Sequence, residues 1–258
     1  MPAKAVVVKI GGSTLGSHDT TLEDVASLQK EGRQVVVVHG GGKTITEWLE
    51  RSGVPTRFVR GLRVTDGPSL QVVMAVLGGL VNKELVASLA ALGVRAIGMT
   101  GIDGRLIECE ATDAELGFVG EIKRINLGLL NVILEGGYVP VVAPLGIGPA
   151  DGKADMPLNI NADTVAGEMA AALGAGQLIF LTDVVGVCDA GNNLIPCLTS
   201  AETRSLIDFG VISRGMIPKV EACLRAASAS AEALIIDGRS SHALLDALHG
   251  KAAGTRIS

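Results

Sequence analysis

Aromatic residues are scarce in this chain of 258 residues. One Trp, one Tyr and four Phe make up 2% of the sequence, whereas hydrophobic residues together make up 48%. The core must therefore be built from Val, Ile, Leu and Ala, which is typical of strands covered by helices on both faces. A chain of this length can bury a substantial core, in one large α/β domain or two small ones.

Cysteine is also sparse, and its four copies are scattered along the chain. They form no CxxC pair and have no companion histidines, which argues against both disulfides and a zinc site. We expect reduced thiols in a cytoplasmic protein at Cys109, Cys188, Cys197 and Cys223.

Basic runs and long apolar runs are absent as well. With a net charge of -5 and no cluster of Lys or Arg, the chain lacks the electrostatic footprint of a nucleic-acid-binding protein. Any anionic ligand must then be met by local positive groups. Each apolar run is broken by Gly or charge well before the roughly 20 residues that a membrane span needs. The first residues show no signal-peptide pattern, so we expect no membrane partner.

Short β-branched runs alternate with helical stretches from end to end. Strand-like runs at residues 5–10 and 34–40 are each followed by a helical stretch, at residues 21–32 and 43–53. This alternation predicts an α/β fold with a mainly parallel sheet and crossover helices. No linker interrupts the chain, so we expect a single domain over residues 1–258 with two lobes that divide near Gly174.

Further elements follow from periodicity and turn residues. We expect a long amphipathic helix at 69–92 ended by Gly93, a β-hairpin at 102–113, a helix at 127–135, a buried strand running into a loop at 137–148, a helix at 162–175, a strand from 177, a hairpin turn at 189–193, two more helices, and a strand at 232–237 that finishes the chain.

Two of the expected strands end in glycines. The first leads into Gly11 and Gly12, and the second into Gly40–Gly42. Ligands of open parallel sheets bind beyond the carboxyl ends of strands, where glycines let the backbone approach a phosphate and a following helix adds a favourable field. Two such turns side by side could hold one phosphoryl group. The alternative is that they are tight turns requiring positive φ.

The second turn continues into Gly-Lys-Thr, as a P-loop does. Val37 stands where the P-loop needs its first glycine, so that motif is absent. The dinucleotide fingerprint also fails, because its third glycine position falls on Ile45.

Two lysines and one aspartate lie near these turns. Lys9 sits in an apolar strand beside Gly11, where it must reach solvent or face a polar cavity. Lys219 follows a glycine loop and a proline suited to the first turn of a helix. Asp163 opens a helix as an N-terminal carboxylate and could also bridge the two lysines. Each lysine could instead be an ordinary solvated side chain.

Two polar residues complete the candidate site, and a third polar residue nearby is set apart from it. The planar fork of Arg63 suits a carboxylate, and Asn159 could add an amide donor, although Arg63 could also be a surface loop residue. His39 is interpreted as a turn-packing residue and not as a general base, because phosphoryl transfer to a carboxylate removes no proton from the nucleophile.

Six motifs occur in order along the chain: Lys9–Gly12, His39–Gly42, Gly61–Thr65, Asn159–Asp163, Leu181–Val184 and Gly215–Lys219. In order and spacing they resemble the amino acid kinase superfamily, and within it the N-acetylglutamate kinase family, over essentially the whole chain. The resemblance implies a three-layer αβα sandwich. It also implies ATP-dependent phosphorylation of the side-chain carboxylate of N-acetyl-L-glutamate, the second step of arginine biosynthesis.

The resemblance also implies a role for each matching residue. Lys9 and Lys219 would neutralise the transferred phosphoryl group, and Asp163 would hold both ammonium groups. Gly11 and Gly12 would contact phosphoryl oxygens, and the substrate would be bound by Gly41, Gly42, Arg63 and Asn159. The N-terminal lobe would hold the amino acid. ATP would lie on the C-terminal lobe, from residue 175 on, against Asp183, Val184, Val185, Gly186, Val187, Cys188, Val211, Ile212, Ser213, Gly215 and Met216. Mg²⁺ would be carried on the nucleotide phosphates, without a protein metal site.

Two alternatives remain open at this stage. One is a kinase of the same fold that acts on a carrier-linked aminoadipate in lysine biosynthesis. Such relatives usually alter the third glycine of Gly40–Gly42 and the Gly61–Thr65 loop, both intact here. The other is a non-catalytic sensor, against which the presence of Lys9, Lys219 and Asp163 argues.

The assembly is also an expectation from the resemblance. Relatives that arginine inhibits carry an extra N-terminal helix, whereas here the first strand is expected to begin by about Ala3. The resemblance therefore implies a homodimer without arginine feedback, with the helix at residues 69–92 as the dimer contact.

Overall fold

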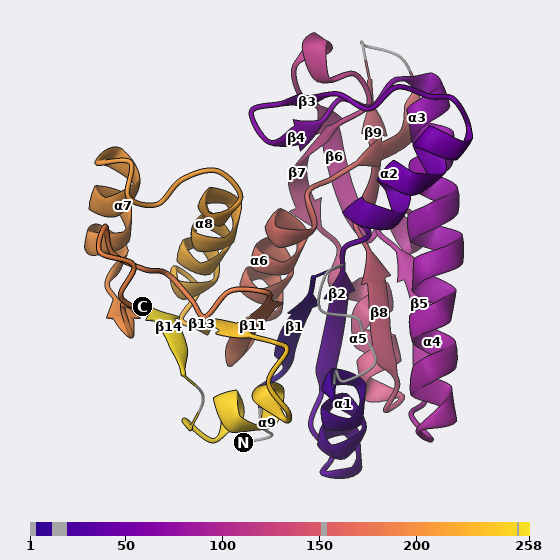
Figure 1. Cartoon of the computed structure of the whole chain (residues 1–258). Helices are drawn as coiled ribbons and strands as arrows, with labels where there is room; N and C mark the ends of the chain where they lie inside the picture. The colour runs from indigo at the N-terminus through magenta and orange to yellow at the C-terminus, as the bar shows by residue number, and fades with distance from the viewer. Residues whose placement is uncertain (1–3, 12–19, 151–153, 252) are drawn as a thin grey trace.

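A computed structural model describes residues 4–11, 20–150, 154–251 and 253–258 (Figure 1). Its centre is an eight-stranded sheet in the order β12-β14-β13-β11-β1-β2-β8-β5. All pairs in it are parallel except β13 with β14. Its strands are β1 (Val6–Ile10), β2 (Val35–His39), β5 (Ala96–Thr100), β8 (Val139–Ala143), β11 (Gln177–Thr182), β12 (Cys197–Leu198), β13 (Glu232–Asp237) and β14 (Gly254–Ile257). The predicted α/β class with a mainly parallel sheet is confirmed.

The central strands are buried on both faces because their residues are apolar without interruption. Every residue of β1 and β2 is buried. Val7 and Val36 point into one hydrophobic cluster, whereas Val8 and Val37 point into a second cluster on the opposite face. Alternate side chains of one strand thus serve two cores, as expected for strands between helical layers.

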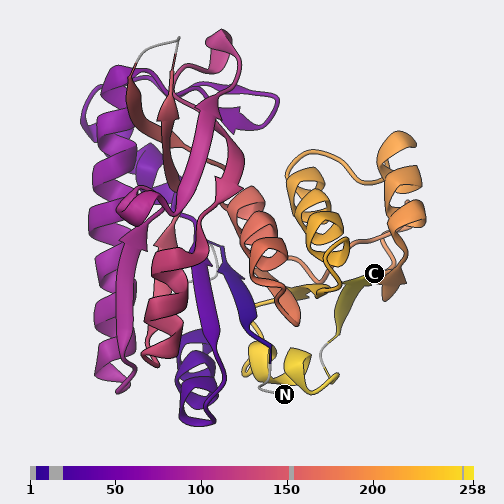
Figure 2. The same ribbon diagram turned by 180° about the vertical axis from the view of Figure 1, so that it is seen from behind.

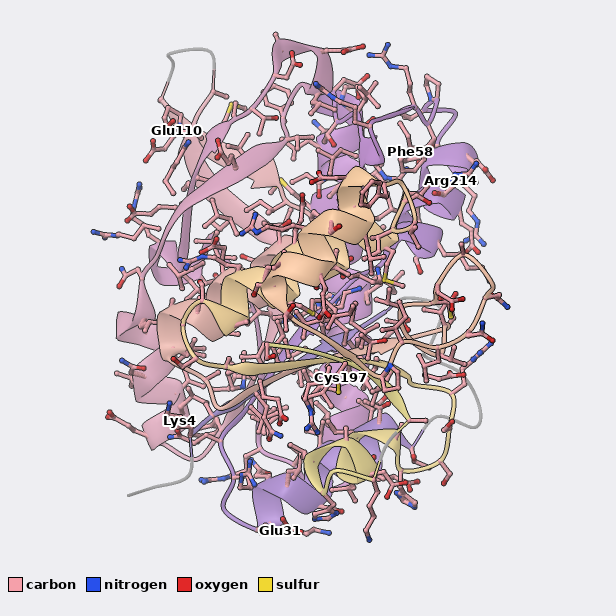
Figure 3. All side chains as sticks on the ribbon, turned by 90° about the vertical axis from the view of Figure 1, so that its left-hand side faces the viewer. Lys4, Glu31, Phe58, Glu110, Cys197 and Arg214 are labelled. Atoms are coloured by element: carbon pink, nitrogen blue, oxygen red, sulfur yellow. The ribbon has the colours of Figure 1, made fainter. Side chains whose placement is uncertain are left out.

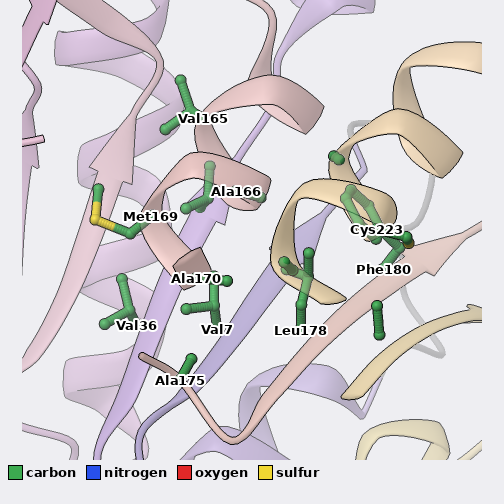
Figure 4. Packing of buried hydrophobic residues seen from close by; sticks show 14 of the residues in the cluster. Val7, Val36, Val165, Ala166, Met169, Ala170, Ala175, Leu178, Phe180 and Cys223 are labelled. Atoms are coloured by element: carbon green, nitrogen blue, oxygen red, sulfur yellow. The ribbon is translucent and has the colours of Figure 1, made fainter. Parts of the chain in front are cut away.

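Helices cover both faces of this sheet (Figures 1 and 2). One face carries α1 (Thr21–Lys30), α2 (Gly42–Arg51), the long helix that includes α3 (Gly67–Met74) and α4 (Asn82–Ala91), and α9 (Ala243–Leu248). The other face carries α5 (Leu127–Glu135), α6 (Ala162–Leu173), α7 (Ser200–Asp208) and α8 (Met216–Ala227). Figure 4 shows the core on this other face, where Met169 and Ala170 of α6 pack over Val7 and Val36.

The long helix joins α3 and α4 through a π-helical segment, Ala75–Val81. It ends where expected, because Gly93 follows with a φ of +82°. Among the described helices, this one (Gly67–Ala91) is long and apolar enough to cross a membrane by length and composition. One of its faces packs on the sheet through Leu85 and Leu89, which accounts for part of that apolar character.

The hairpin expected within residues 102–113 is wrong in its bounds. Only β6 (Ile107–Ala111) lies there, and its partner β7 (Gly120–Ile125) comes later in the chain. The residues before β6 form a 3₁₀ turn, Asp103–Arg105. The Asp103 carboxylate favours this turn, because it accepts hydrogen bonds from the N–H and hydroxyl of Thr100 at 2.7 and 2.9 Å.

The prediction of a loop after the strand that begins at residue 139 is also wrong. β9 (Leu145–Pro149) is a strand that pairs with β10 (Asp155–Asn159), and a second sheet forms in the order β10-β9-β6-β7. A side chain at Gly148 would collide with the carbonyl of Cys109. The glycines therefore mark a close approach of two strands and not a loop.

The C-terminal part of the chain holds more structure than expected. The turn at residues 189–193 is present, but it supports only an isolated bridge between Cys188 and Leu194. Beyond the strand expected to finish the chain lie α9 and β14, which pairs with β13. Both elements are short and weakly periodic, so tertiary pairing determines them more than the local sequence does.

Asp24 of α1 and His242, next to α9, form a pH-dependent ion pair between these two helices. The His242 Nδ1 lies 2.7 Å from the buried Asp24 Oδ1. Hydrogen bonding to this carboxylate and its negative charge raise the pKa of His242. Burial raises the pKa of Asp24, against the opposing effect of His242.

Replacing His242 with Gln tests this link. A raised folded-state pKa means that the stabilisation is complete below the unfolded value of about 6.5 and is lost as pH rises through the folded value. We expect His242→Gln to lower the free energy of unfolding more at pH 6 than at pH 9, measured by urea denaturation. His249→Gln, at the end of the same helix, is the control, and a deficit that grows with pH would contradict the interpretation.

Candidate active site

A pocket of about 210 Å³ lies beyond the carboxyl ends of β1 and β2. It brings together six of the residues predicted from sequence: Lys9, Gly41, Gly42, Arg63, Asn159 and Asp163. Apolar side chains, among them Phe58, Leu62 and Val119, supply another part of its lining. These residues come from distant segments, so the sheet topology assembles the pocket.

Three charged groups meet at this pocket, and two of them, Lys9 and Asp163, belong to its lining. Lys9 Nζ and Lys219 Nζ each lie 2.8 Å from Asp163, the former from Oδ1 and the latter from Oδ2. Lys9 and Asp163 are buried, with relative exposures of 6% and 5%. One carboxylate thus bridges two ammonium groups, which leaves a formal charge of +1 for the three groups.

Local structure explains how the bridge forms. Asp163 is fixed in the first turn of α6, where the Asn161 side chain caps the helix and accepts from the N–H of Asp163 at 2.8 Å. Lys219 lies in the first turn of α8. The helices α8 and α6 run side by side (Figures 1 and 3). A Cβ at Gly167 would lie 2.7 Å from the Cα of Ala222, so this glycine allows the two helices to approach closely.

The electrostatics favour the ionised bridge. Burial alone would raise the pKa of Asp163, but the charges of Lys9 and Lys219 outweigh it and hold the pKa below its ordinary value. The carboxylate is therefore charged near neutral pH, and the two ammonium groups are held in place for an anionic ligand.

Arg63 and Asn159 line the same pocket and are held by hydrogen bonds. The guanidinium of Arg63 donates to Gly42 O at 3.0 Å and to Thr46 Oγ1 at 2.8 Å, and lies over the Phe58 ring at 4.8 Å. It belongs to a short hairpin of β3 (Phe58–Val59) and β4 (Leu62–Arg63), not to the irregular loop expected. Asn159 at the end of β10 donates to Thr65 Oγ1 at 3.1 Å.

Positive φ does not explain why glycines follow β1 and β2. None of Gly11 and Gly40–Gly42 adopts a left-handed conformation, and Gly41 has a φ of 171°. A Cβ at Gly41 would lie 2.8 Å from Leu77 Cδ2, so a larger residue here would force the end of this side chain on the long helix to move. Gly11 lies outside the pocket lining, and its N–H donates to Leu181 O at 3.3 Å. Gly12 lies outside the described residues.

A second cavity, of about 500 Å³, lies beyond the carboxyl end of β11. It is lined by ten of the eleven residues predicted for the nucleotide: Asp183, Val184, Val185, Gly186, Val187, Cys188, Val211, Ile212, Ser213 and Met216. Gly215 is outside the lining. Gly186, with a φ of +142°, is required there because a Cβ would lie 2.7 Å from Leu194 and from Thr255.

Sequence reasoning missed Asp189, Asn192 and Arg239, which also line the second cavity. Arg239 follows β13 and is held by a fork to Asp237 at 2.8 and 2.7 Å. The rule that ligands bind beyond strand ends, applied to β13, could have found it.

Within the part of the chain that the structure describes, no three His, Cys, Asp or Glu residues form a group able to hold a metal ion. Among the residues that line the cavities, the acidic ones are Asp163 in the first and Asp183 and Asp189 in the second.

Comparisons with known proteins agree on one family. The profile of the amino acid kinase family matches residues 4–237. An acetylglutamate kinase of Dehalococcoides mccartyi is 43% identical over 98% of this chain and 93% of its own length. That of Parasynechococcus marenigrum is 47% identical over 94% of this chain and 84% of its own length.

Solved structures extend the comparison to the fold. The smu.665 protein of Streptococcus mutans superposes with a TM-score of 0.84 at 32% identity, covering 98% of each chain. An N-acetylglutamate synthase of Neisseria gonorrhoeae gives the same TM-score at 22% identity, covering 99% of this chain and 59% of its own, which indicates a shared fold.

Asp163→Asn tests the role of the bridge in stability. Removing the charge leaves two ammonium groups unpaired, one of them buried, so we expect the free energy of unfolding to fall by about 3 kcal/mol. Glu168→Gln on the same helix is the matched control. Its partner Arg225, at 2.9 Å, is half exposed, so the loss should stay within about 1 kcal/mol. Equal losses in urea denaturation would contradict the bridge.

Proposed function

The chain belongs to the amino acid kinase family, and from this membership we propose that it is an acetylglutamate kinase, which transfers the γ-phosphoryl group of ATP to N-acetyl-L-glutamate in arginine biosynthesis. The observation that carries the proposal is the Lys9–Asp163–Lys219 bridge, two members of which, Lys9 and Asp163, line one pocket of amino-acid size together with Arg63. Curated acetylglutamate kinases that are 40–47% identical over nearly the whole chain support the same substrate.

The substrate is proposed to lie in the 210 Å³ pocket. Arg63 and Asn159 bind its α-carboxylate, since a guanidinium fork and an amide N–H are suitable donors for that group. The backbone N–H groups of Gly41 and Gly42 contact the substrate from the second strand end. The side-chain carboxylate of the substrate then points toward Lys9.

Catalysis in this proposal rests on charge neutralisation and positioning. An oxygen of the substrate carboxylate attacks the γ-phosphorus, the bond to the β-phosphate oxygen breaks, and ADP leaves. Lys9 and Lys219 offset the negative charge that the two anions bring together, and Asp163 keeps both ammonium groups in place. The attacking carboxylate has no proton to lose, so no general base is needed. Gly11 and Gly12 are proposed to contact phosphoryl oxygens.

ATP is proposed to bind in the 500 Å³ cavity, on residues Asp183–Cys188 and on Val211, Ile212, Ser213, Gly215 and Met216. This assignment divides the domain near Gly174, with residues 1–174 for the amino acid and 175–258 for the nucleotide. Mg²⁺ would arrive on the nucleotide phosphates and add positive charge there. The four free cysteines support a cytoplasmic setting.

Two alternatives remain. A carrier-linked aminoadipate acceptor would use the same charged bridge but a more open pocket for the amino acid. A non-catalytic sensor would not need Lys9 and Lys219 on one carboxylate, so the ion pairs at 2.8 Å favour an enzyme.

We further propose that two copies associate through the long helix and the groove beside it. The groove measures about 700 Å³ and is lined largely by apolar side chains, including Met74, Ile97, Ile102 and Leu129. An exposed apolar groove of this kind favours a protein partner, and a homodimer is the simplest closed assembly.

The substrate assignment is tested by ADP release with Mg-ATP on a panel of acceptors. N-acetyl-L-glutamate should react, whereas free glutamate, aspartate and an aminoadipate compound should not. Lys9→Ala and Lys219→Ala should each lower turnover on the order of 10²-fold or more, as for other single donors at developing charge. Reaction of the aminoadipate compound alone would assign a different pathway.

The dimer is tested by light scattering of the wild type and of Leu129→Glu. Leu129 is 37% exposed and lines the groove, so a buried charge there should shift the dimer toward monomers. Phe209→Glu, at an 81% exposed position after α7, is the control and should stay dimeric. A stable hexamer or a wild-type monomer would contradict the proposal.

A further inference from the structure

A buried polar cluster lies directly beneath the glycine turn of the substrate pocket. It consists of His39 at the end of β2 and Asn82 at the start of α4, both with no exposed surface. Buried polar side chains are costly unless they are fully hydrogen-bonded. The proposed mechanism gives neither residue a part, although Gly40, next to His39, lines the pocket.

The hydrogen bonds of this cluster determine which ring nitrogen of His39 carries the proton. Nδ1 lies 2.8 Å from Gly40 O, which can only accept, so Nδ1 must carry the hydrogen. Nε2 lies 3.1 Å from Asn82 Nδ2 and accepts from it. Burial lowers the pKa of His39 to about 4 despite the bond to Gly40, and the nearby Lys83 and Lys9 act in the same direction. The ring is therefore neutral near pH 7.

Asn82 is fixed in this orientation by its other contacts. Its Nδ2 also donates to Val141 O at 2.9 Å, and its Oδ1 accepts from Lys83 Nζ at 2.9 Å. A side chain at Gly98 would collide with Asn82 Oδ1, so β5 leaves room for the carboxamide. The carboxamide therefore cannot flip without losing several hydrogen bonds.

The π-helical segment includes or adjoins both residues of the long helix that pack near the glycine turn. It ends immediately before Asn82, and its Leu77 packs into the space left by the missing side chain of Gly41. Such π segments recur at functional sites because they change which residues of a helix face inward. From the same helix, Asn82 thus contacts His39 and Leu77 packs beside Gly41.

We propose that Asn82 is a positioning residue for phosphoryl transfer and that it acts through His39. Asn82 keeps His39 in the tautomer that carries its proton on Nδ1, and this N–H group donates to the carbonyl of Gly40. The hydrogen bond fixes the orientation of that carbonyl and so directs the N–H groups of Gly41 and Gly42 toward the pocket. This inference rests on the proposed function for its chemistry, but the tautomer can be observed without any substrate.

The experiment combines NMR with kinetics on the full chain. In protein labelled with ¹⁵N-histidine, two-bond ¹⁵N–¹H spectra report the protonated nitrogen, and His39→Gln assigns the signal among the four histidines. The wild type should show a neutral His39 with its proton on Nδ1 from pH 6 to pH 8. Asn82→Leu should show mixed tautomers and a kcat lower by roughly 10- to 100-fold, with little change in the KM for ATP.

Leu85→Ala, a buried change on the same helix, is the matched control. It should lower Tm and keep the tautomer and kcat of the wild type. If Asn82→Leu fails to fold, Gly98→Ala is the second variant, because the added methyl group displaces the Asn82 carboxamide.

A proton on Nε2 in the wild type, or a wild-type kcat in a folded Asn82→Leu, would overturn the inference. So would an equal loss of kcat in Leu85→Ala. A wild type that turns over no acceptor would instead contradict the proposed function, and the tautomer measurement would still decide whether Asn82 orders His39.

Discussion

The arrangement of this protein depends on one carboxylate that holds two ammonium groups. Asp163 can meet both Lys9 and Lys219 at 2.8 Å only if a central strand and two helices converge at one point. The sheet brings β1 there, the cap by Asn161 fixes the start of α6, and Gly167 lets α8 approach. Removing Asp163 would leave two ammonium groups without this partner, one of them buried, which is a strong constraint on the sequence.

The same bridge links stability to chemistry. A net positive charge beside a pocket is unfavourable for the free protein and favourable once a polyanion binds. The Arg63 guanidinium, held by Gly42 and Thr46, adds a further positive charge to the lining of the pocket. A negatively charged amino acid and a phosphoryl group can therefore approach each other without strong repulsion, which fits the proposed reaction.

Sequence reasoning predicted the features that depend on local pattern and on strand ends. The parallel sheet and the helices near residues 69–92 and 127–135 are in the structure, and so are six predicted residues in the first pocket and ten in the second cavity. It failed where tertiary contacts override local signals. The glycines of β9 indicated a loop, but they permit close strand contact with Cys109. Asn82 gave no signal at all, because its role depends on a π segment and on His39, distant in the chain.

The most direct test of the central claim is a structure of the protein with Mg-ADP, N-acetyl-L-glutamate and aluminium fluoride, which stands in for the phosphoryl group in flight. The account predicts the fluoride group between Lys9 Nζ and Lys219 Nζ, within hydrogen-bond distance of both, with Asp163 still bridging them and Arg63 on the α-carboxylate of the substrate. A fluoride group bound away from either lysine, or a substrate lying outside the pocket of Arg63 and Asn159, would contradict it.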